Sequence, residues 1–356
     1  MRDIAVLEVR NESFNVWAAV AAVVRRGVAV TMADYCVSYV RLSRPKLVLT
    51  FIDNTSTFYE LKRFSPGVKF VSVQNGWRDD AVFDIWKATK ANHELGADFV
   101  LCFGAAIGQK YLDCMTAHVL PIGSLKNNKV LPDTARRQEG SVLFLSQFRA
   151  PVESVAGPVM PVGARGIPWR DFYSAETVLL PLLLEFTRMR GLQLNICGCS
   201  AAHEHSQEKQ FFEDILGPHG WELIQRQENL SSYRRVIEAS HIVSIDSTLG
   251  VEAVGRGAKV AFFGLRGAIL GTTDRSYGWE AGFAPQGPFW TNTTDRGEFE
   301  RVMHYLIEAG DEEWQTDRRR FVDGVISFDP GNATFLQLMR DLGAPLNGDQ
   351  CSDVRR

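Results

Sequence analysis

The chain has 356 residues, of which 45% are hydrophobic and 23% are charged. This length fits two domains or one large domain, and the composition is that of an ordinary globular protein. It excludes a disordered, collagen-like or coiled-coil chain. The 39 Lys and Arg residues against 42 Asp and Glu residues give a formal charge of −3. That charge argues against a general basic surface for nucleic acid, but it allows a local basic patch for a phosphorylated ligand.

The two longest apolar runs, at 16–24 and 178–186, are shorter than the roughly 20 residues that span a bilayer. The N-terminus lacks the layout of a signal peptide, because Arg25 and Arg26 stand where a small-residue cleavage site would be needed. The six cysteines are dispersed along the chain, which is typical of free thiols in a reducing compartment. We therefore expect a cytoplasmic protein.

The first 130 residues alternate between short β-rich runs and helical ones. Strands are expected at 3–9, 28–32, 46–52, 69–73, 98–103 and 117–122, and helices at 15–25, 58–62, 80–94 and 106–115. Repeated βα alternation predicts a parallel sheet with helices on both faces. The polar segment 131–140 is predicted to be a linker.

A second βα series follows the linker, over residues 141–330. Strands are expected at 141–146, 192–197, 221–224, 241–245 and 259–263, a loop at 150–169, and helices at 172–190, 207–216, 231–239, 250–256 and 298–308. A last helix at 332–342 belongs to a C-terminal helix and tail, 331–356. The predicted fold class is α/β, with two Rossmann-like, doubly wound domains that face a central cleft. Ligands of such sheets bind beyond the carboxyl ends of the strands.

In the first domain, polar residues follow the strand at 46–52. They begin with Asp53 and Asn54. A carboxylate at this position is suited to act as a general base or a nucleophile. The alternative is that the cluster caps a helix, since Asp, Asn, Thr and Ser all serve as N-caps.

A second polar group, Gln74, Asn75 and Arg78, follows the strand at 69–73. Asn-Gly at 75–76 is typical of a turn, which by itself would explain part of this segment. A turn does not call for Arg78, whose guanidinium is suited to hold a phosphate or a carboxylate through two hydrogen bonds. We therefore count all three residues, with Asp53 and Asn54, as candidate catalytic residues.

In the second domain, the strand at 141–146 ends at Ser146 and continues into Gln147 and Arg149. These polar groups lie at the expected interdomain edge, within reach of a nucleotide. An ordinary loop is the alternative. We take the three residues as candidate donor-binding residues.

The most informative element is the strand at 241–245 and the turn and helix that follow it, Asp246-Ser247-Thr248-Leu249-Gly250-Val251-Glu252. The first N–H groups of a helix are unpaired and its N-terminal dipole end is positive, so an anion is favoured there. Ser247 and Thr248 add hydroxyl donors, and Glu252 is placed to accept hydrogen bonds from ribose hydroxyls. The alternative is a capped helix with an acidic first turn.

Several other signatures are missing from the sequence. There is no GxGxxG after a strand and no GxxxxGK[ST], which argues against a dinucleotide fold of the usual type and against a P-loop enzyme. No DxD triplet occurs, and the pair His203 and His205 lacks a third ligand. We therefore expect no metal site, and we expect phosphates to be bound by backbone and side-chain donors.

Four motifs together resemble a known family. They are FIDNTSTFYEL (51–61), VSVQNGWRDD (71–80), LPIGSLKNN (120–128) and SIDSTLGVEAVGRGAKVAFFG (244–264). Their order resembles that of bacterial surface-carbohydrate biosynthesis proteins, a set of GT-B glycosyltransferases. The last motif is also similar to capsule-type transferases of the ulosonic acid 3-deoxy-manno-octulosonic acid (Kdo). The resemblance covers roughly residues 45–330.

The resemblance implies a cytoplasmic enzyme that moves a sugar from a nucleotide-activated donor to a lipopolysaccharide, O-antigen or capsule glycan. Residues 1–130 would form the acceptor-side domain and residues 141–330 the nucleotide-sugar-binding domain. The implied partners are the nucleotide sugar and a glycan acceptor, with peripheral contact to the inner membrane or to a larger glycan-assembly protein, and without nucleic acid. No cofactor is implied.

We expect Asp53 to act near the anomeric carbon and the helix end at Ser247 and Thr248 to stabilise the departing phosphate. The preferred donor is a CMP-activated ulosonic acid, although the chain lacks a His-Pro dipeptide of the kind some CMP-sugar enzymes use. The alternatives are a UDP- or GDP-sugar transferase, a nucleotide-sugar epimerase of GT-B shape, or a non-catalytic sugar-binding protein.

Overall fold

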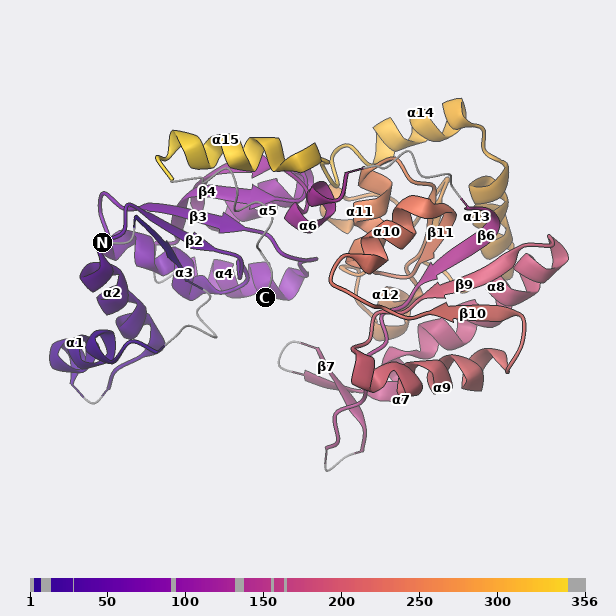
Figure 1. The fold of residues 1–356 in the computed structure, drawn as a ribbon, viewed down its shortest axis with the longest axis horizontal. Helices are drawn as coiled ribbons and strands as arrows, with labels where there is room; N and C mark the ends of the chain where they lie inside the picture. Colours follow the sequence, from indigo (N-terminus) through magenta and orange to yellow (C-terminus); the bar gives the residue numbers. More distant parts are fainter. Residues whose placement is uncertain are drawn as a thin grey trace. The chain divides into compact units, whose positions relative to one another are not determined.

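A computed structural model describes residues 3–7, 14–27, 29–90, 94–131, 138–154, 157–162 and 165–344. The chain divides into two compact units (Figure 1). Unit 1 comprises Met1–Lys129 and Ile326–Arg356, and unit 2 comprises Val130–Val325. Of the predicted linker 131–140, residues 132–137 lie outside the described residues, and residues 138–140 already belong to a strand of unit 2.

In the described part of unit 1, five strands pair side by side in parallel in the order β1-β2-β3-β4-β5. The strands are β1 (Ile4–Val6), β2 (Leu47–Thr50), β3 (Lys69–Val73), β4 (Gly96–Cys102) and β5 (Thr116–Pro121). The helices are α1 (Val16–Arg26), α2 (Met32–Ser43), α3 (Ser56–Leu61), α4 (Asp80–Lys90), α5 (Ala105–Cys114), α6 (Leu125–Lys129) and α15 (Ala333–Asp341). The βα alternation read from the sequence is therefore confirmed here.

Helix α15 returns from the end of the chain to unit 1 and lies along its sheet (Figure 1). Its Leu338 and Met339 are buried with apolar residues of β2, β3 and β4. The predicted C-terminal helix at 332–342 is thus present and is part of unit 1. The tail beyond it, 345–356, lies outside the described residues.

The predicted strand at 28–32 is wrong. Residues 29–31 are not in a strand, Val28 lies outside the described residues, and α2 begins at Met32. Thr31 and Asp34 form a reciprocal capping box, in which each side chain accepts a hydrogen bond from the backbone N–H of the other residue. This box starts a helix, so the apolar run before it belongs to a loop.

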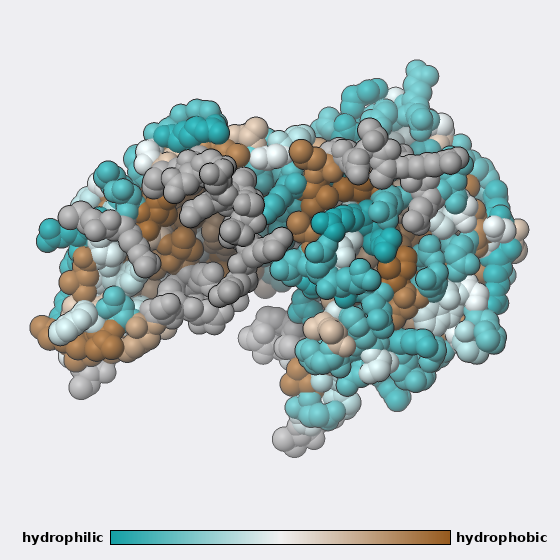
Figure 2. Space-filling view, in the orientation of Figure 1, coloured by the Kyte–Doolittle hydropathy of each residue, from teal (hydrophilic) through white to brown (hydrophobic). Residues whose placement is uncertain are grey.

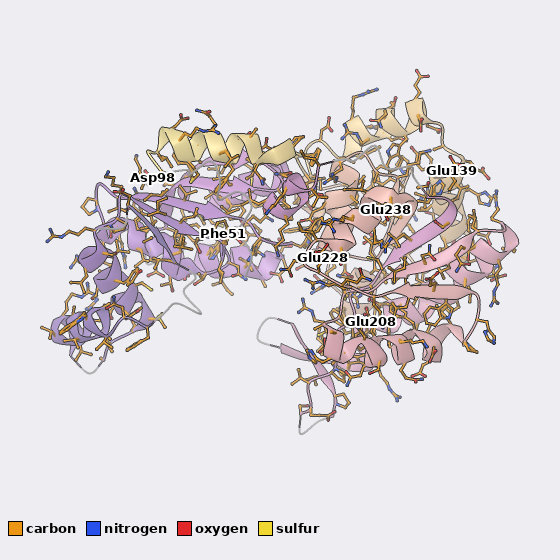
Figure 3. All side chains as sticks on the ribbon, viewed as in Figure 1. Phe51, Asp98, Glu139, Glu208, Glu228 and Glu238 are labelled. Atoms are coloured by element: carbon orange, nitrogen blue, oxygen red, sulfur yellow. The ribbon has the colours of Figure 1, made fainter. Side chains whose placement is uncertain are left out.

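A charged cluster closes the amino edge of the unit 1 sheet. Asp98 near the start of β4 (Figure 3) accepts hydrogen bonds from Lys62 Nζ at 2.5 Å, from Lys69 Nζ at 3.1 Å and from the Phe70 N–H at 2.8 Å. These contacts tie β4 to β3 at the end opposite to the predicted site. This cluster therefore lies at the amino edge of the sheet, and the predicted site residues after β2 and β3 lie at the carboxyl edge.

In the described part of unit 2, seven strands pair in the order β10-β9-β6-β11-β12-β14-β13, and every pair except β13–β14 is parallel. The strands are β6 (Gln138–Leu145), β9 (Gln193–Cys197), β10 (Trp221–Ile224), β11 (Ala239–Ser244), β12 (Val260–Phe263), β13 (Gln286–Gly287) and β14 (Trp290–Thr291). The helices are α7 (Trp169–Phe172), α8 (Ser174–Met189), α9 (His205–Leu216), α10 (Ser231–Glu238), α11 (Thr248–Gly255), α12 (Leu265–Leu270), α13 (Arg296–Glu308) and α14 (Asp311–Phe321). One large core joins these strands to α8, α9 and α13.

The segment 150–169, predicted to be a loop, contains an antiparallel hairpin of β7 (Val159–Val162) and β8 (Arg165–Pro168). Helices α12 and α14 and strands β13 and β14 were not predicted. Across the residues that the structure describes, no helix is both long and apolar enough to cross a membrane.

Candidate functional site

Asp53 and Arg78 meet at the carboxyl edge of the unit 1 sheet, after β2 and β3. Because β2 and β3 are parallel neighbours, the residues that follow them leave the sheet at the same edge. Arg78 Nε donates to Asp53 Oδ2 at 2.8 Å and Arg78 Nη2 donates to Asp53 Oδ1. The guanidinium of Arg78 thus makes two hydrogen bonds to a carboxylate of the protein itself, that of Asp53.

Two further donors complete the surroundings of the Asp53 carboxylate. The Asn75 N–H donates to Oδ1 at 3.3 Å, and the Tyr111 hydroxyl, from α5, donates to Oδ2. The Tyr59 hydroxyl donates to the backbone oxygen of Asp53 at 2.9 Å. Asp53 is fully buried and Arg78 is 6% exposed. Both carboxylate oxygens are therefore enclosed by protein donors.

The burial of this cluster shifts the pKa of its members. Burial, together with the charge of Asp53, raises the pKa values of the Tyr59 and Tyr111 hydroxyls well above their ordinary value. Burial alone would lower the pKa of the Arg78 guanidinium, but the charge of Asp53 and the hydrogen bonds to it raise that pKa. The tyrosines are neutral donors and Arg78 is a permanent cation.

The polar cluster that begins at Asp53 does supply the N-cap of α3, but the cap residue is Thr55 and not Asp53. Asn54 lies beside Asp53 and is half-buried. Gln74 is buried and connects backbone segments: its amide donates to the Gly76 oxygen at 2.9 Å and accepts from the Phe103 N–H at 2.9 Å. Gln74 therefore stabilises the turn after β3, and its side chain is not exposed at the surface.

Asn75 is the exposed member of the group. Its side-chain oxygen accepts a hydrogen bond from Arg78 Nη2 at 2.7 Å. Asp53 therefore holds Arg78, and Arg78 holds the Asn75 amide at the surface of the sheet edge. The sequence predicted these residues as separate groups, and the structure brings them into one network.

In unit 2, three residues separate the end of β11 at Ser244 from the start of α11 at Thr248. Its N-cap residue is Ser247, whose side chain makes no capping hydrogen bond. The first helical hydrogen bond runs from the Gly250 N–H to the Ser247 oxygen at 3.0 Å. The N–H groups of Thr248 and Leu249 precede it, at the positive end of the helix dipole. The helix dipole favours an anion near this end, and the phosphate site at Ser247 and Thr248 stays a prediction.

Gly250 lets α11 approach β11 closely. A Cβ atom at this position would stand 2.7 Å from Ser244 Oγ and 2.8 Å from Ser244 Cβ. The Ser244 hydroxyl in turn accepts a hydrogen bond from the Ser247 N–H at 3.2 Å, which fixes the turn before the helix. Glu252 lies on α11 and is 3% exposed.

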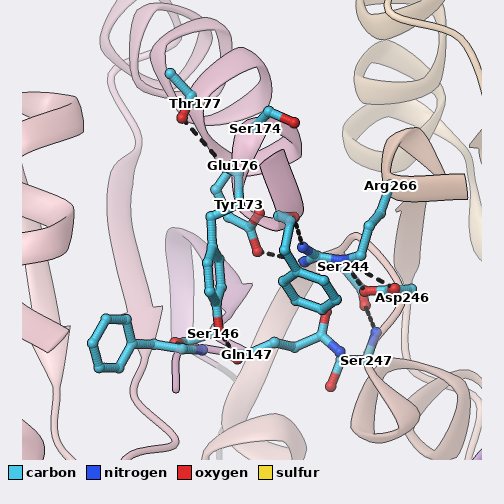
Figure 4. Close-up of polar contacts among 12 residues, drawn as sticks. Ser146, Gln147, Tyr173, Ser174, Glu176, Thr177, Ser244, Asp246, Ser247 and Arg266 are labelled. Atoms are coloured by element: carbon cyan, nitrogen blue, oxygen red, sulfur yellow. Dashed lines mark hydrogen bonds and ion pairs between the residues drawn. The ribbon is translucent and has the colours of Figure 1, made fainter. Parts of the chain in front are cut away.

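Beside this helix end, Asp246 is paired with two arginines, of which Figure 4 labels Arg266. Arg266 Nε lies 3.1 Å from Asp246 Oδ2, and Arg275 Nη1 lies 2.9 Å from the same oxygen. Arg266 also donates to Glu176 Oε1 at 2.6 Å and stacks over the Phe172 ring. Arg266 is fully buried, whereas the Arg275 side chain is 23% exposed.

The four charged side chains of this cluster differ in their exposure to solvent. They are Glu176, Asp246, Arg266 and Arg275. Burial would lower the pKa of Arg266, but the charges of Asp246 and Glu176 raise it. Burial raises the pKa of Glu176 although Arg266 opposes this effect. Arg266 and Glu176 are therefore interior groups that fix Asp246. Arg275 is the partly exposed cation of the cluster.

The predicted donor-binding residues Ser146, Gln147 and Arg149 make hydrogen bonds within unit 2. The Ser146 hydroxyl donates to Glu208 Oε1 at 2.5 Å, and Glu208, on α9 (Figure 3), also accepts from the Ser200 hydroxyl at 2.6 Å. The Gln147 oxygen accepts from the hydroxyl of Tyr173, and that hydroxyl accepts from the Arg149 N–H at 2.8 Å. The side chain of Ser146 is thus committed to Glu208, while Arg149 is exposed.

Sequence reasoning missed Tyr111, Glu176, Glu208, Arg266 and Arg275. Four of these residues lie in predicted or observed helices, far along the chain from the residues they contact, and Arg275 lies in a loop after α12. Position gave one usable signal: Arg266 follows β12 by three residues, at the same sheet edge as Asp246. In the described ranges, no three His, Cys, Asp or Glu side chains are grouped as metal ligands.

The fold of this chain is similar to that of a "putative UDP-N-acetylglucosamine 2-epimerase" from Listeria monocytogenes. The matched region covers 88% of this chain and 79% of that protein, at 13% identity and a TM-score of 0.53. The match to a UDP-GlcNAc 2-epimerase from Neisseria meningitidis bound to UDP-GlcNAc covers 87% of this chain and 81% of that protein, at 13% identity and a TM-score of 0.50. The chain spans 61% of the length of a chain of the GtfA/B complex, at 15% identity and a TM-score of 0.46. The sequence matches none of the curated proteins.

These likenesses show the fold, and they confirm the predicted α/β fold of GT-B type with two Rossmann-like domains. A family model described as "putative O-antigen biosynthesis protein" matches residues 71–343, which include three of the four motifs named above. The predicted role in surface-carbohydrate biosynthesis is confirmed at this level, and the finer similarity to Kdo transferases stays a prediction. The chain belongs to this family of O-antigen biosynthesis proteins.

Proposed function

We propose that this protein is a glycosyltransferase that takes a sugar from a nucleotide-activated donor and adds it to a bacterial surface glycan. The observation that carries the proposal is the N-terminal end of α11 with Arg275 beside it. The N–H groups of Thr248 and Leu249 and the Ser247 hydroxyl belong to this helix end, and the partly exposed Arg275 guanidinium pairs with Asp246, which directly precedes the N-cap residue. Such an arrangement of donors suits the phosphates of a nucleotide sugar.

The same donors would stabilise the leaving phosphate. As the sugar–phosphate bond breaks, negative charge builds on the phosphate oxygens, and preorganised donors that face this charge lower the barrier. Asp246 repels an anion, but its charge is offset by Arg266, which is buried against it. Arg275 therefore offers its exposed N–H groups to the ligand.

In unit 1, we assign Asn75 the contact with substrate, and we assign Asp53 and Arg78 the role of positioning it. Action of Asp53 as base or nucleophile requires a carboxylate oxygen that reaches the anomeric carbon. Both oxygens are instead bonded to donors within the unit, and the side chain is fully buried. Asn54, half-buried beside Asp53, is a second candidate for contact with a sugar.

The donor is a nucleotide sugar, and no metal or further cofactor is part of the proposal. A CMP-activated ulosonic acid is the donor that the motif at 244–264 favours. The fold likeness to two UDP-GlcNAc epimerases makes UDP-sugars the first competitor, and it makes epimerisation the second candidate function.

The test is a donor panel with the full-length chain: CMP-Kdo, UDP-GlcNAc, UDP-glucose and GDP-mannose, each with and without an oligosaccharide acceptor from lipopolysaccharide. Transfer predicts nucleotide release that depends on acceptor and persists in EDTA. Epimerisation predicts a changed sugar without acceptor. Binding without turnover of any donor would leave a sugar-binding protein and refute the proposal.

Arg275→Gln tests the assignment of the phosphate site. Loss of one charged hydrogen bond is worth about 1.5–3 kcal/mol, so the donor Kd should rise by at least about tenfold. The matched control is Arg296→Gln, because Arg296 is an exposed arginine of the same unit, ion-paired with Glu185. Equal donor affinity of both variants would place the phosphates elsewhere.

A further inference from the structure

Helix α1 buries its small residues and exposes its large ones. Ala18 and Ala22 are fully buried on the side that packs against α2. The exposed fractions on the opposite side run from 45% to 81%, at Val16, Trp17, Val20, Val23 and Val24. Their spacing places them on one stripe of the helix. We call these five residues the α1 face.

The contacts of α1 explain why this face points outward. Arg25 lies on the same side as the two alanines and reaches α2, where its Nη2 donates to the Asp34 oxygen at 2.9 Å and to Asp34 Oδ1 at 3.1 Å. The capping box that starts α2 uses the other oxygen of Asp34. The polar contacts thus fix the alanine side inward, and the valines and Trp17 remain in solvent.

An amphipathic helix of a globular protein normally turns its apolar stripe to the core. Single exposed apolar residues are ordinary, but a contiguous patch marks a surface that another body covers. Figure 2 shows apolar residues gathered over α1 at the edge of unit 1. Described residues near the helix in the chain extend the set: Phe14 is 72% exposed, Met32 54% and Leu42 54%.

The segment that carries this face has a positive formal charge, in which Arg25 and Arg26 pair with Asp34 and Lys46 pairs with Asp3. Residues 14–46 carry five basic side chains and one acidic side chain, a formal charge of +4 in a chain whose formal charge is −3. The basic residues are Arg25, Arg26, Arg41, Arg44 and Lys46. A second copy of this chain would bring the same positive charge to the contact, and like charges oppose that pairing. A surface with negative charge and an apolar interior is complementary in both respects.

We propose that the α1 face attaches the protein to an anionic lipid bilayer, with α1 lying in the plane of the membrane interface. The valines would enter the boundary of headgroups and acyl chains, Trp17 would sit at the headgroup level that tryptophan prefers, and the exposed Arg41 and Arg44 of the α2 end would meet the lipid phosphates. This inference goes beyond the proposed function and does not depend on it, because lipid binding needs no donor or turnover.

The test is flotation of the full-length chain with vesicles of phosphatidylglycerol and phosphatidylethanolamine, and separately with vesicles of phosphatidylcholine alone. The wild-type chain should float with the anionic vesicles, and less so as salt rises. Trp17→Gln with Val24→Gln should weaken binding at least about tenfold, because both side chains leave water on binding. Both are more than three-quarters exposed, so the double variant should keep its fold.

The matched control is Ile85→Gln on α4, in the same unit, where Ile85 is 60% exposed outside the α1 face. It should bind as the wild type does. Arg41→Gln removes one exposed charge and should weaken anionic binding about fivefold, from about 1 kcal/mol per basic residue, with little effect on phosphatidylcholine.

The proposal is overturned if the wild-type chain ignores anionic vesicles, or if the double variant binds them as well as the control does. It is also overturned if ultracentrifugation shows a dimer that the double variant dissociates while neither form binds lipid. Should the double variant fail to fold, Arg41→Gln and the salt dependence decide the question alone.

Discussion

The pair of Asp53 and Arg78 leads to a quantitative prediction about unit 1. Both side chains are almost entirely buried, and the carboxylate accepts from four donors. Asp53→Asn removes the charge but keeps the shape, so it leaves the Arg78 guanidinium as an unpaired cation in the interior. Breaking a buried pair in this way costs about 3–5 kcal/mol. For a unit of this size, about 3 kcal/mol corresponds to a fall in Tm of roughly 6–12 °C.

A double-mutant cycle separates the pair from its surroundings. Arg78→Met alone should destabilise unit 1 by a similar amount, because it leaves the Asp53 carboxylate without its counter-ion. The double variant should be more stable than the sum of the two single effects by at least about 2 kcal/mol. The control is Asp80→Asn, whose carboxylate is 49% exposed and pairs with Lys110 at 3.5 Å, and which should cost at most about 1 kcal/mol.

The two units need separate readouts, because a two-unit protein does not unfold in one step. Hydrogen exchange followed by mass spectrometry on peptides from β3 and α5 reports on unit 1, and peptides from β11 report on unit 2. If Asp53→Asn leaves exchange in β3 and α5 unchanged, the reasoning about this ion pair is refuted. Activity of Asp53→Asn, which keeps Arg78 and Asn75, then tests the role of Asp53. Near wild-type kcat means that the Asp53 charge is not needed for chemistry, and a loss of about 100-fold or more with unchanged exchange in β3 and α5 restores the base or nucleophile.

The strands were predictable from the sequence because they are continuous apolar runs. Residues 46–52 and 69–73 are covered on both faces, and parallel strands of this kind carry few polar residues to obscure the pattern. The carboxyl edge follows from the βα order alone, so the neighbourhood of Asp53 and Arg78 was implied before any contact was known. What the pattern does not contain is the partner of each polar group.

Those partners come from helices distant in the chain. Tyr111, on α5, is 58 residues from Asp53, and Glu176, on α8, is 90 residues from Arg266. Such pairs depend on how each helix packs on its sheet, which the residue pattern of a single sequence does not record. Polar residues that directly follow a strand predict a ligand site, so the sequence alone places Asp53, Gln74 and Ser146 among the candidate site residues. In the structure all three satisfy buried polar groups, which must be paired wherever a chain turns inside a core.

Two missed helices had signals that could have been used. The segment of α2 begins with Thr31 and Asp34, the spacing of a capping box, and this local signal outweighs the apolar residues before it. Helix α14 has Asp311, Glu312 and Glu313 in its first turn and three arginines in its last. This charge order complements the helix dipole and is typical of an exposed helix.

Two further predictions concern local geometry. Gly250→Ala should destabilise unit 2 by about 1–3 kcal/mol and weaken donor binding, because its Cβ would stand 2.7 Å from Ser244 Oγ and push α11 away from β11; unchanged protection of β11 in hydrogen exchange would contradict this. The second is a pH dependence of the α1–α2 pair. Hydrogen bonds from Thr31, and then from Arg26, lower the pKa of Asp34 from 3.8 to about 2. A carboxyl whose pKa is lower in the folded state stabilises that state above pH 3.8, and the stabilisation is lost as the pH falls toward 2. Pepsin should therefore cleave within α1 and α2 increasingly between pH 4 and pH 2. In Asp34→Asn the cleavage should already be fast at pH 4 and change little below it, and a variant that keeps the wild-type pH profile would show that another carboxyl controls the opening.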